Sequence, residues 1–316
     1  MNRAIDAYLA ELEARRFSHS RRYHSARMLE RLLLYLREAH QVTDWRAVNE
    51  THLRDFAVYA ATHHRTPKGK LISAATLRQW LAIIRSFFVW LNRNGRLLHN
   101  PAERLAFPRK EQPLPHVLNE SDIARLIEAP DTTTALGIRD RALMETLYAT
   151  GIRHSEAHKL DLYDIDTTAH RLTARLGKGQ RGRLVPLTET AAHWLSRYIT
   201  AARPELAAGK LWGKGRRRGQ PKLIPPTSAL WLAVTGRRLS YQMIAERIYD
   251  CALQAELKAT VHTFRHSCAT HLLRGGASVR HVQQLLGHRD LNTTEIYTHI
   301  ELQDLQQAIE SAANKA

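Results

Sequence analysis

The chain has 316 residues, a formal net charge of +17 and a pI near 10.3, and 44% of its residues are hydrophobic. This length suits two domains and this apolar fraction suffices for two cores, so the chain as a whole is not a disordered tail. The positive field favours a polyanion as partner. Basic ribosomal and membrane-surface proteins share such a charge, so charge alone does not specify DNA.

Neither a membrane span nor a leader is visible. The apolar runs at 32–36 and 87–91 are far shorter than the ~18–20 residues that cross a bilayer. The N-terminus mixes arginines with acidic residues and lacks the apolar core of a signal peptide. The two cysteines, Cys251 and Cys268, have neither Cys-x-x-Cys nor zinc-finger spacing and are expected to be reduced core residues. We therefore expect a soluble, cytoplasmic protein.

Residues 1–108 predict a bundle of four helices. A short helix is expected over 2–14, followed by an amphipathic stretch that begins at Ser20 and by a helix after Thr51. The fourth is expected between Ser73, a preferred N-cap residue, and Asn94, just before Gly95. Lys and Arg exceed Asp and Glu by more in residues 1–110 than in the remainder, so this domain is the more basic one.

Prolines mark the end of this bundle. Pro108, Pro113 and Pro115 cannot continue a helix, so residues 109–116 are expected to form an extended linker. The second domain is then expected over 117–316.

The second domain predicts a mainly helical fold with one small antiparallel β-sheet. Two alternating strands are expected at 171–176 and 183–187, joined by a glycine-rich hairpin turn over 177–182. A glycine- and proline-rich segment over 208–228 predicts a solvated loop, for which phosphate contact is the alternative. The expected helices cover 121–129, 138–150, 155–161, 188–202, 240–256, 263–274, 278–286 and 301–313.

Six residues of this domain combine positive charge, proton transfer and a phenol. Guanidinium groups bind phosphate oxygens in pairs and stay charged, so such a set suits attack on a phosphodiester rather than on a carbonyl or a sugar. The six are Arg153 in ATGIRHSE, Lys178 in LGKG, His262 and Arg265 in HTFRHSCATHLL, His288 in LLGH, and Tyr297 nine residues later.

The order and framing of these residues resemble the tyrosine recombinase (phage integrase) family, especially its compact Xer-like members. All six catalytic positions of the family pattern are filled. The segment 73–108 resembles the family's core-binding (SAM-like) domain, so the resemblance covers nearly the whole chain. It implies that the two domains clamp double-stranded DNA, and that a homo-tetramer on paired sites exchanges strands through a Holliday junction. A related recombinase or accessory proteins could take part, in the bacterial cytoplasm near the nucleoid.

Each of the six residues has an expected role. Tyr297 is the nucleophile that forms a 3′-phosphotyrosyl bond, and Arg153 and Arg265 clamp the phosphate. Lys178 is the candidate general acid for the departing 5′ oxygen, a role that the resemblance supports. His262 is placed as an acid–base partner, and His288 as a phosphate donor. Glu156 is expected to orient the basic residues.

No cofactor and no metal are expected. The chain has 18 histidines, but on a helix His271 lies about 180° from His262, and Arg265 shares the face of His262 and His266. A fixed cation there repels a metal ion and attracts phosphate. No acidic cluster has metal-ligand spacing.

Two other functions and one contact stay open. A type IB topoisomerase uses similar chemistry on a single duplex, and a DNA-binding protein with an inactive site would lack the chemistry. A C-terminal apolar stripe at 302–312 suits contact with a neighbouring subunit or packing within the chain. The DNA target and the biological role cannot be inferred, because phosphate contacts carry no sequence information.

Overall fold

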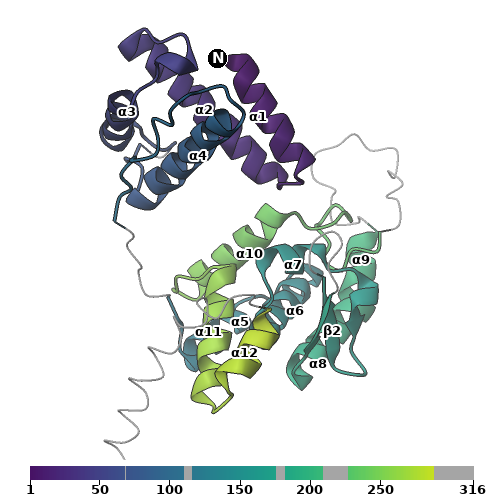
Figure 1. The fold of residues 1–316 in the computed structure, drawn as a ribbon. Helices are drawn as coiled ribbons and strands as arrows, with labels where there is room; N and C mark the ends of the chain where they lie inside the picture. The colour runs from purple at the N-terminus through teal and green to yellow at the C-terminus, as the bar shows by residue number, and fades with distance from the viewer. Residues whose placement is uncertain (68, 110–115, 176–181, 209–226, 288–316) are drawn as a thin grey trace, which may run out of the picture. The chain divides into compact units, whose positions relative to one another are not determined.

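The computed structural model describes residues 1–67, 69–109, 116–175, 182–208 and 227–287. The chain divides into two compact units, Met1–Pro113 and Leu114–Ala316, whose elements are drawn in Figure 1. Helices dominate both units, and the described strands all lie in the second. The mainly helical fold with a small antiparallel sheet is therefore confirmed. Residues 110–115 are not described, and the boundaries at 108, 109 and 116 stay predictions.

The N-terminal unit contains the four predicted helices. Three of its helices begin at a side chain that caps them: Ser18, Asn49 and Ser73 each accept a hydrogen bond from a backbone N–H three residues later. A short 3₁₀ turn at Trp45–Ala47, which the sequence did not predict, precedes the third helix. The helices are α1 (Asn2–Ala14), α2 (His19–His40), α3 (Glu50–His63) and α4 (Ala74–Arg93).

Aromatic side chains form the centre of this unit. Phe87 and Phe88 of α4 are completely buried. The Phe87 ring meets Tyr8 of α1 edge-on at 5.4 Å and Trp45 at 4.9 Å between ring centroids. Because the apolar stripe of each helix faces this centre, the opposite faces of α2 and α4 are left to polar and charged residues.

The C-terminal unit largely follows the predicted helices, and two of them end differently from the prediction. The helix predicted over 155–161 ends at Lys159, and a 3₁₀ turn at Leu162–Asp164 follows. The helix predicted over 188–202 continues through a π-helical turn at Tyr198–Ala202 into α9. The one predicted over 301–313 lies outside the described residues. The helices are α5 (Glu120–Glu128), α6 (Ala135–Thr150), α7 (His154–Lys159), α8 (Glu189–Arg197), α9 (Arg203–Ala207), α10 (Tyr241–Gln254), α11 (Val261–Arg274) and α12 (Val279–Leu286).

Helix α6 is the centre of this unit. It contacts α5, α8, α9, α10 and α11, and most of its residues are buried. Its buried charges are paired: the Arg139 guanidinium donates to Asp140 at 2.7 Å and 2.8 Å and to the Leu232 carbonyl at 3.0 Å. A helix enclosed in this way is a rigid support for the turn that follows its C-terminus.

The sheet has three antiparallel strands in the order β1-β2-β3. They are β1 (Ile165–Asp166), β2 (Arg171–Ala174) and β3 (Arg183–Pro186), and the two-residue β1 was not predicted. Leu172 pairs with Val185, and Ala174 pairs with Arg183. Residues 176–181, which include Lys178, lie outside the described part of the chain.

Candidate active site and nucleic-acid interface

Three of the six predicted site residues are described, and the structure brings two of them to one place. Arg153 and Arg265 both donate hydrogen bonds to the end of α12, whereas exposed His262 lies on α11, one turn before Arg265. The other three, Lys178, His288 and Tyr297, lie outside the described residues.

Arg153 is held at the junction between α6 and α7. Helix α6 ends at Gly151, whose left-handed backbone (φ 56°) turns the chain. Arg153 is the N-cap residue of α7, and its backbone N–H donates to Glu156 Oε2 at 2.9 Å while its Nη1 donates to Glu156 Oε1 at 3.1 Å. The backbone N–H and the guanidinium of Arg153 are thus both held by one carboxylate, and the side chain stays 37% exposed.

Arg265 is anchored more deeply. Its helix α11 begins after Thr260, which caps it, and the arginine is only 6% exposed. Its Nη1 donates to the carbonyl of Gly151 at 2.6 Å, and its Nη2 donates to the carbonyl of Leu286 at 3.0 Å. Arg265 therefore links the C-terminal ends of α6 and α12.

The C-terminal end of α12 collects three arginines. Carbonyls in the last turn of a helix have no partner within the helix and carry partial negative charge, so they attract cationic donors. The last of these carbonyls belongs to Gly287, the residue that directly precedes His288 in the sequence. The bonds are Arg183 Nε to the Leu285 oxygen (2.8 Å), Arg265 Nη2 to the Leu286 oxygen (3.0 Å) and Arg153 Nη2 to the Gly287 oxygen (2.8 Å).

Arg183 is a member of this cluster that sequence reasoning did not single out. Its guanidinium donates to both Glu156 oxygens, at 2.9 Å and 3.0 Å, and its side chain is 14% exposed. A signal was available, because Arg183 lies two residues before Val185 and alternate residues of a strand share a face. An arginine on the face of a buried valine requires an acceptor inside the protein.

Glu156 is a structural anion rather than an acid. Burial raises its pKa, but the hydrogen bonds from Arg183 and from the Arg153 backbone outweigh this, and the net pKa is lowered. Its carboxylate accepts from two arginines, as expected of a residue that orients basic groups.

Histidines around the cluster favour the neutral form. Burial lowers the pKa of His154, whose ring stacks on Tyr241 at 3.5 Å between centroids. Burial also lowers the pKa of His266, and the charges of His262 and Arg265 add to this effect. The His262 and His266 rings lie 6.5 Å apart, on one side of α11 as predicted.

The two thiols are unsuited to nucleophilic chemistry. Both cysteines are buried and free, and burial raises the pKa of Cys251 to about 11 and that of Cys268 to about 12. Within the described ranges, no group of three or more His, Cys, Asp or Glu side chains could hold a metal ion. The described part of the site is thus a set of fixed cations, which suits the stabilisation of a phosphate.

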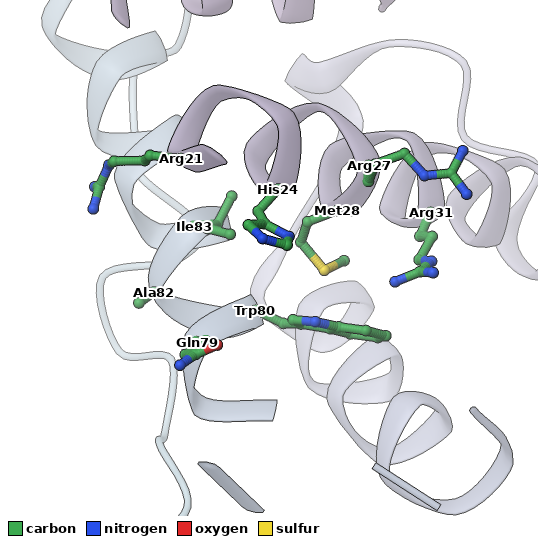
Figure 2. A pocket seen from close by; sticks show the side chains of 9 residues that line it. All are labelled: Arg21, His24, Arg27, Met28, Arg31, Gln79, Trp80, Ala82 and Ile83. Carbon is green, nitrogen blue, oxygen red and sulfur yellow. The ribbon is translucent and has the colours of Figure 1, made fainter. Parts of the chain in front are cut away.

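A second candidate interface lies on the N-terminal unit. A groove of about 380 Å³ runs between α2 and α4, and Figure 2 shows the residues that line it. The Arg31 guanidinium lies over the Trp80 ring, 4.9 Å from its centroid. Arginines clustered on one face are typical of a nucleic-acid interface. The lining residues are Arg21, His24, Arg27, Met28, Arg31, Gln79, Trp80, Ala82 and Ile83.

A helical unit with a basic groove and a second unit with converging arginines are typical of proteins that bind a phosphate-rich polymer. Comparison with protein families identifies the class of protein. Residues 116–304 match the model of the phage integrase family, and residues 5–95 match that of the phage integrase N-terminal SAM-like domain. The chain therefore belongs to the phage integrase family, and it is a tyrosine recombinase, an enzyme of site-specific DNA recombination.

Similar curated proteins carry that name over most of their length. The chain is 36% identical to tyrosine recombinase XerC 2 of Ralstonia nicotianae, covering 86% of this chain and 73% of the relative. It is 34% identical to tyrosine recombinase XerD of Listeria monocytogenes, covering 87% and 86%. It is 42% identical to tyrosine recombinase XerC of Pelotomaculum thermopropionicum, covering 72% of both.

Solved structures of low identity share the fold. A λ integrase tetramer bound to a Holliday junction matches with a TM-score of 0.68 at 15% identity, over 94% of this chain and 76% of that one. XerH recombinase in a pre-cleavage complex with its difH substrate matches with a TM-score of 0.67 at 21% identity, over 91% and 78%. Among the described helices, none is long and apolar enough to cross a membrane.

Proposed function

We propose that this recombinase cleaves and rejoins duplex DNA through a covalent bond between Tyr297 and the 3′ phosphate. The phenol oxygen attacks phosphorus and the 5′ oxygen leaves; the phenol gives up a proton and the leaving oxygen receives one. The reverse attack by a 5′ hydroxyl reseals the strand without an external energy source. The supporting observation is that Arg153 and Arg265, from different helices, converge on the C-terminal end of α12, which directly precedes His288 in the sequence.

The two arginines suit the proposed phosphate clamp because of how they are fixed. Arg265 is buried and bound by two backbone carbonyls, and Arg153 is bound by one carbonyl and one carboxylate. Fixed guanidinium groups stabilise the charge that gathers on the non-bridging oxygens without reorganising during the reaction. In this proposal Lys178 protonates the 5′ oxygen, His262 exchanges a proton with the phenol or phosphate, and His288 donates to the phosphate.

We assign the groove between α2 and α4 to DNA backbone contact. Its arginines would release counterions from the duplex, and the Trp80 face offers a further support for Arg31. By analogy with the λ integrase tetramer on a Holliday junction, the active assembly would be a homo-tetramer on two paired sites. A cytoplasmic location with the chromosome, and the involvement of accessory proteins, stay predictions.

Covalent trapping tests this function without knowledge of the target. A library of duplexes with a random core and a nick is incubated with the protein, adducts are isolated under denaturing conditions, and the attached strands are sequenced. The nick lets the short cleaved fragment diffuse away, so the adduct cannot reverse. We expect one sequence class attached to Tyr297. Tyr297→Phe should bind the same DNA and form no adduct; an adduct from this variant would contradict the proposal.

The trapped sequence then separates recombination from simple relaxation. Two copies of it on one supercoiled plasmid should be recombined by the wild-type protein through a four-way junction. Relaxation of a plasmid without the sequence would instead favour a topoisomerase, and DNA binding without any adduct would favour a protein with an inactive site.

A further inference from the structure

Arg183 connects three elements that lie next to proposed catalytic residues along the chain: β3 comes after Lys178, α7 comes directly after Arg153, and α12 comes shortly before His288. It begins strand β3, donates to both oxygens of Glu156 on α7, and donates to the Leu285 carbonyl at the end of α12. Helix α7 follows Arg153, and the last turn of α12 leads to His288. Four of the hydrogen bonds around Glu156 come from only two residues, Arg153 and Arg183.

Gly287 packs directly against this side chain. Its backbone is left-handed (φ 66°), and a Cβ placed there would lie 3.0 Å from Arg183 Nη1 and 3.1 Å from its Cζ. The guanidinium cannot easily move aside, because Glu156 and Leu285 hold it on other sides. The chain therefore passes over Arg183 immediately before His288.

We propose that Arg183 is a positioning residue that keeps Arg153 available to the scissile phosphate. This inference rests on the proposed function. Glu156 carries one negative charge and accepts from two arginines, so the trio Glu156, Arg153 and Arg183 retains one positive charge. Without Arg183, the Glu156 charge is balanced by Arg153 alone, and the positive charge intended for the phosphate is neutralised locally.

Geometry adds to the charge effect. With Arg183 gone, both Glu156 oxygens are free to turn toward the Arg153 guanidinium, which would draw Arg153 Nη2 from the Gly287 carbonyl that it now contacts at 2.8 Å. The Leu285 carbonyl would lose its arginine donor as well. Both changes displace the clamp relative to the end of α12.

Arg175 provides a matched control on the same hairpin. It follows strand β2, which pairs with β3, and its Nη2 lies 2.6 Å from Asp164 and its Cζ 4.4 Å from the Tyr163 ring centroid. Losing Arg175 loosens the base of the hairpin but leaves the hydrogen bonds of Glu156 in place. An effect that comes from a loose hairpin would be shared by both arginines.

The test compares Arg183→Gln, Arg183→Lys and Arg175→Gln on the trapped DNA sequence. Affinity, thermal midpoint and the first-order rate of adduct formation at saturating DNA are measured for each. We expect Arg183→Gln to cleave roughly 100-fold more slowly than wild type, because small displacements of clamp groups cost factors of that order. Arg183→Lys keeps the charge but cannot reach all three acceptors, so its cleavage rate should lie between those of the wild type and Arg183→Gln. The DNA affinity of both Arg183 variants should be little changed. Arg175→Gln should cleave at close to the wild-type rate.

A double variant separates positioning from loss of folding. Adding Glu156→Gln to Arg183→Gln removes the carboxylate that would neutralise Arg153, so it should restore part of the cleavage rate. A double variant that is slower than Arg183→Gln, or an Arg175→Gln that is equally slow, would overturn the inference. Absence of an adduct in the wild-type protein is a separate result: it would remove the proposed function, on which the inference depends.

Discussion

Replacement of Gly151 by alanine tests whether the ends of α6 and α12 must touch. Gly151 has a left-handed backbone (φ 56°), and a Cβ there would lie 2.6 Å from Leu286 Cδ2 and 3.3 Å from Cys268 Sγ. The backbone conformation costs an alanine about 1–2 kcal/mol. Overpacking against a buried neighbour adds about 1–3 kcal/mol. We expect Gly151→Ala to lower the free energy of unfolding of the C-terminal unit by roughly 2–5 kcal/mol.

Gly276→Ala is the control that isolates the contact. Gly276 also has a left-handed backbone (φ 88°), but a Cβ there meets nothing within 4 Å. This variant should therefore show the backbone cost alone. Urea unfolding, with hydrogen exchange resolved by peptide to identify the C-terminal unit, measures both variants.

The same contact predicts an effect on catalysis. If Leu286 moves away from an alanine at position 151, Arg265 can no longer donate to the carbonyl of residue 151 and to that of Leu286 at once. Adduct formation should therefore slow in Gly151→Ala and not in Gly276→Ala. A Gly151→Ala protein that unfolds no more readily than Gly276→Ala would refute the packing argument. One that is destabilised but cleaves at the wild-type rate would refute the link to Arg265.

Three further outcomes are expected. Glu156→Gln should lower the free energy of unfolding by about 2–3 kcal/mol, because it disrupts charge-assisted bonds to a buried carboxylate. The pKa of Glu156 is lowered in the folded protein, so the stability advantage of the wild type over this variant should fade as the pH falls below about 4. Urea unfolding at several pH values measures this. The pKa of His266 is lowered in the folded protein, so its contribution to stability is complete above about pH 6.5. At lower pH this contribution declines by at most about 1.4 kcal/mol per pH unit. His266→Gln should flatten that slope in urea titrations. Arg31→Gln should weaken DNA binding about equally for all sequences and reduce the salt slope by about 1, as measured by fluorescence anisotropy at several salt concentrations. Arg54→Gln on α3 should change neither quantity, because Arg54 does not line the groove and its guanidinium donates to Glu50 at 2.8 Å.

Local signals in the sequence are strong enough to predict most helices. Ser73 and Ser240 cap α4 and α10, and Gly287 ends α12 in the left-handed conformation. These features act within one turn of the chain, so a single sequence contains them. The same reasoning missed β1, because a two-residue strand has no period to detect, and it missed the π-helical turn, which is held by the Tyr198 hydroxyl between the backbone groups of Leu230 and Leu232.

Contacts between distant segments are not encoded in that way. The resemblance of the frames indicated Arg153 and Arg265, but the acceptors that fix them are backbone carbonyls, which every residue has and no sequence pattern marks. Arg183 is the clearest case, because its partners Glu156 and Leu285 are 27 and 102 positions away. Packing of α12 on α11, through Leu273 and Val282, decides that these atoms meet.

The choice of acceptor would leave the proposed clamp charged enough to hold a phosphate. A carboxylate partner fixes a guanidinium and cancels its charge, whereas a carbonyl partner fixes it and leaves the charge nearly intact. Both arginines of the proposed clamp use carbonyls at the end of α12, and Arg265 is fixed by Gly151 and Leu286. The carboxylate that also binds Arg153 is balanced by Arg183. The end of a helix thus does for this site what acidic residues could not do, because it positions two cations and leaves them positive for the phosphate.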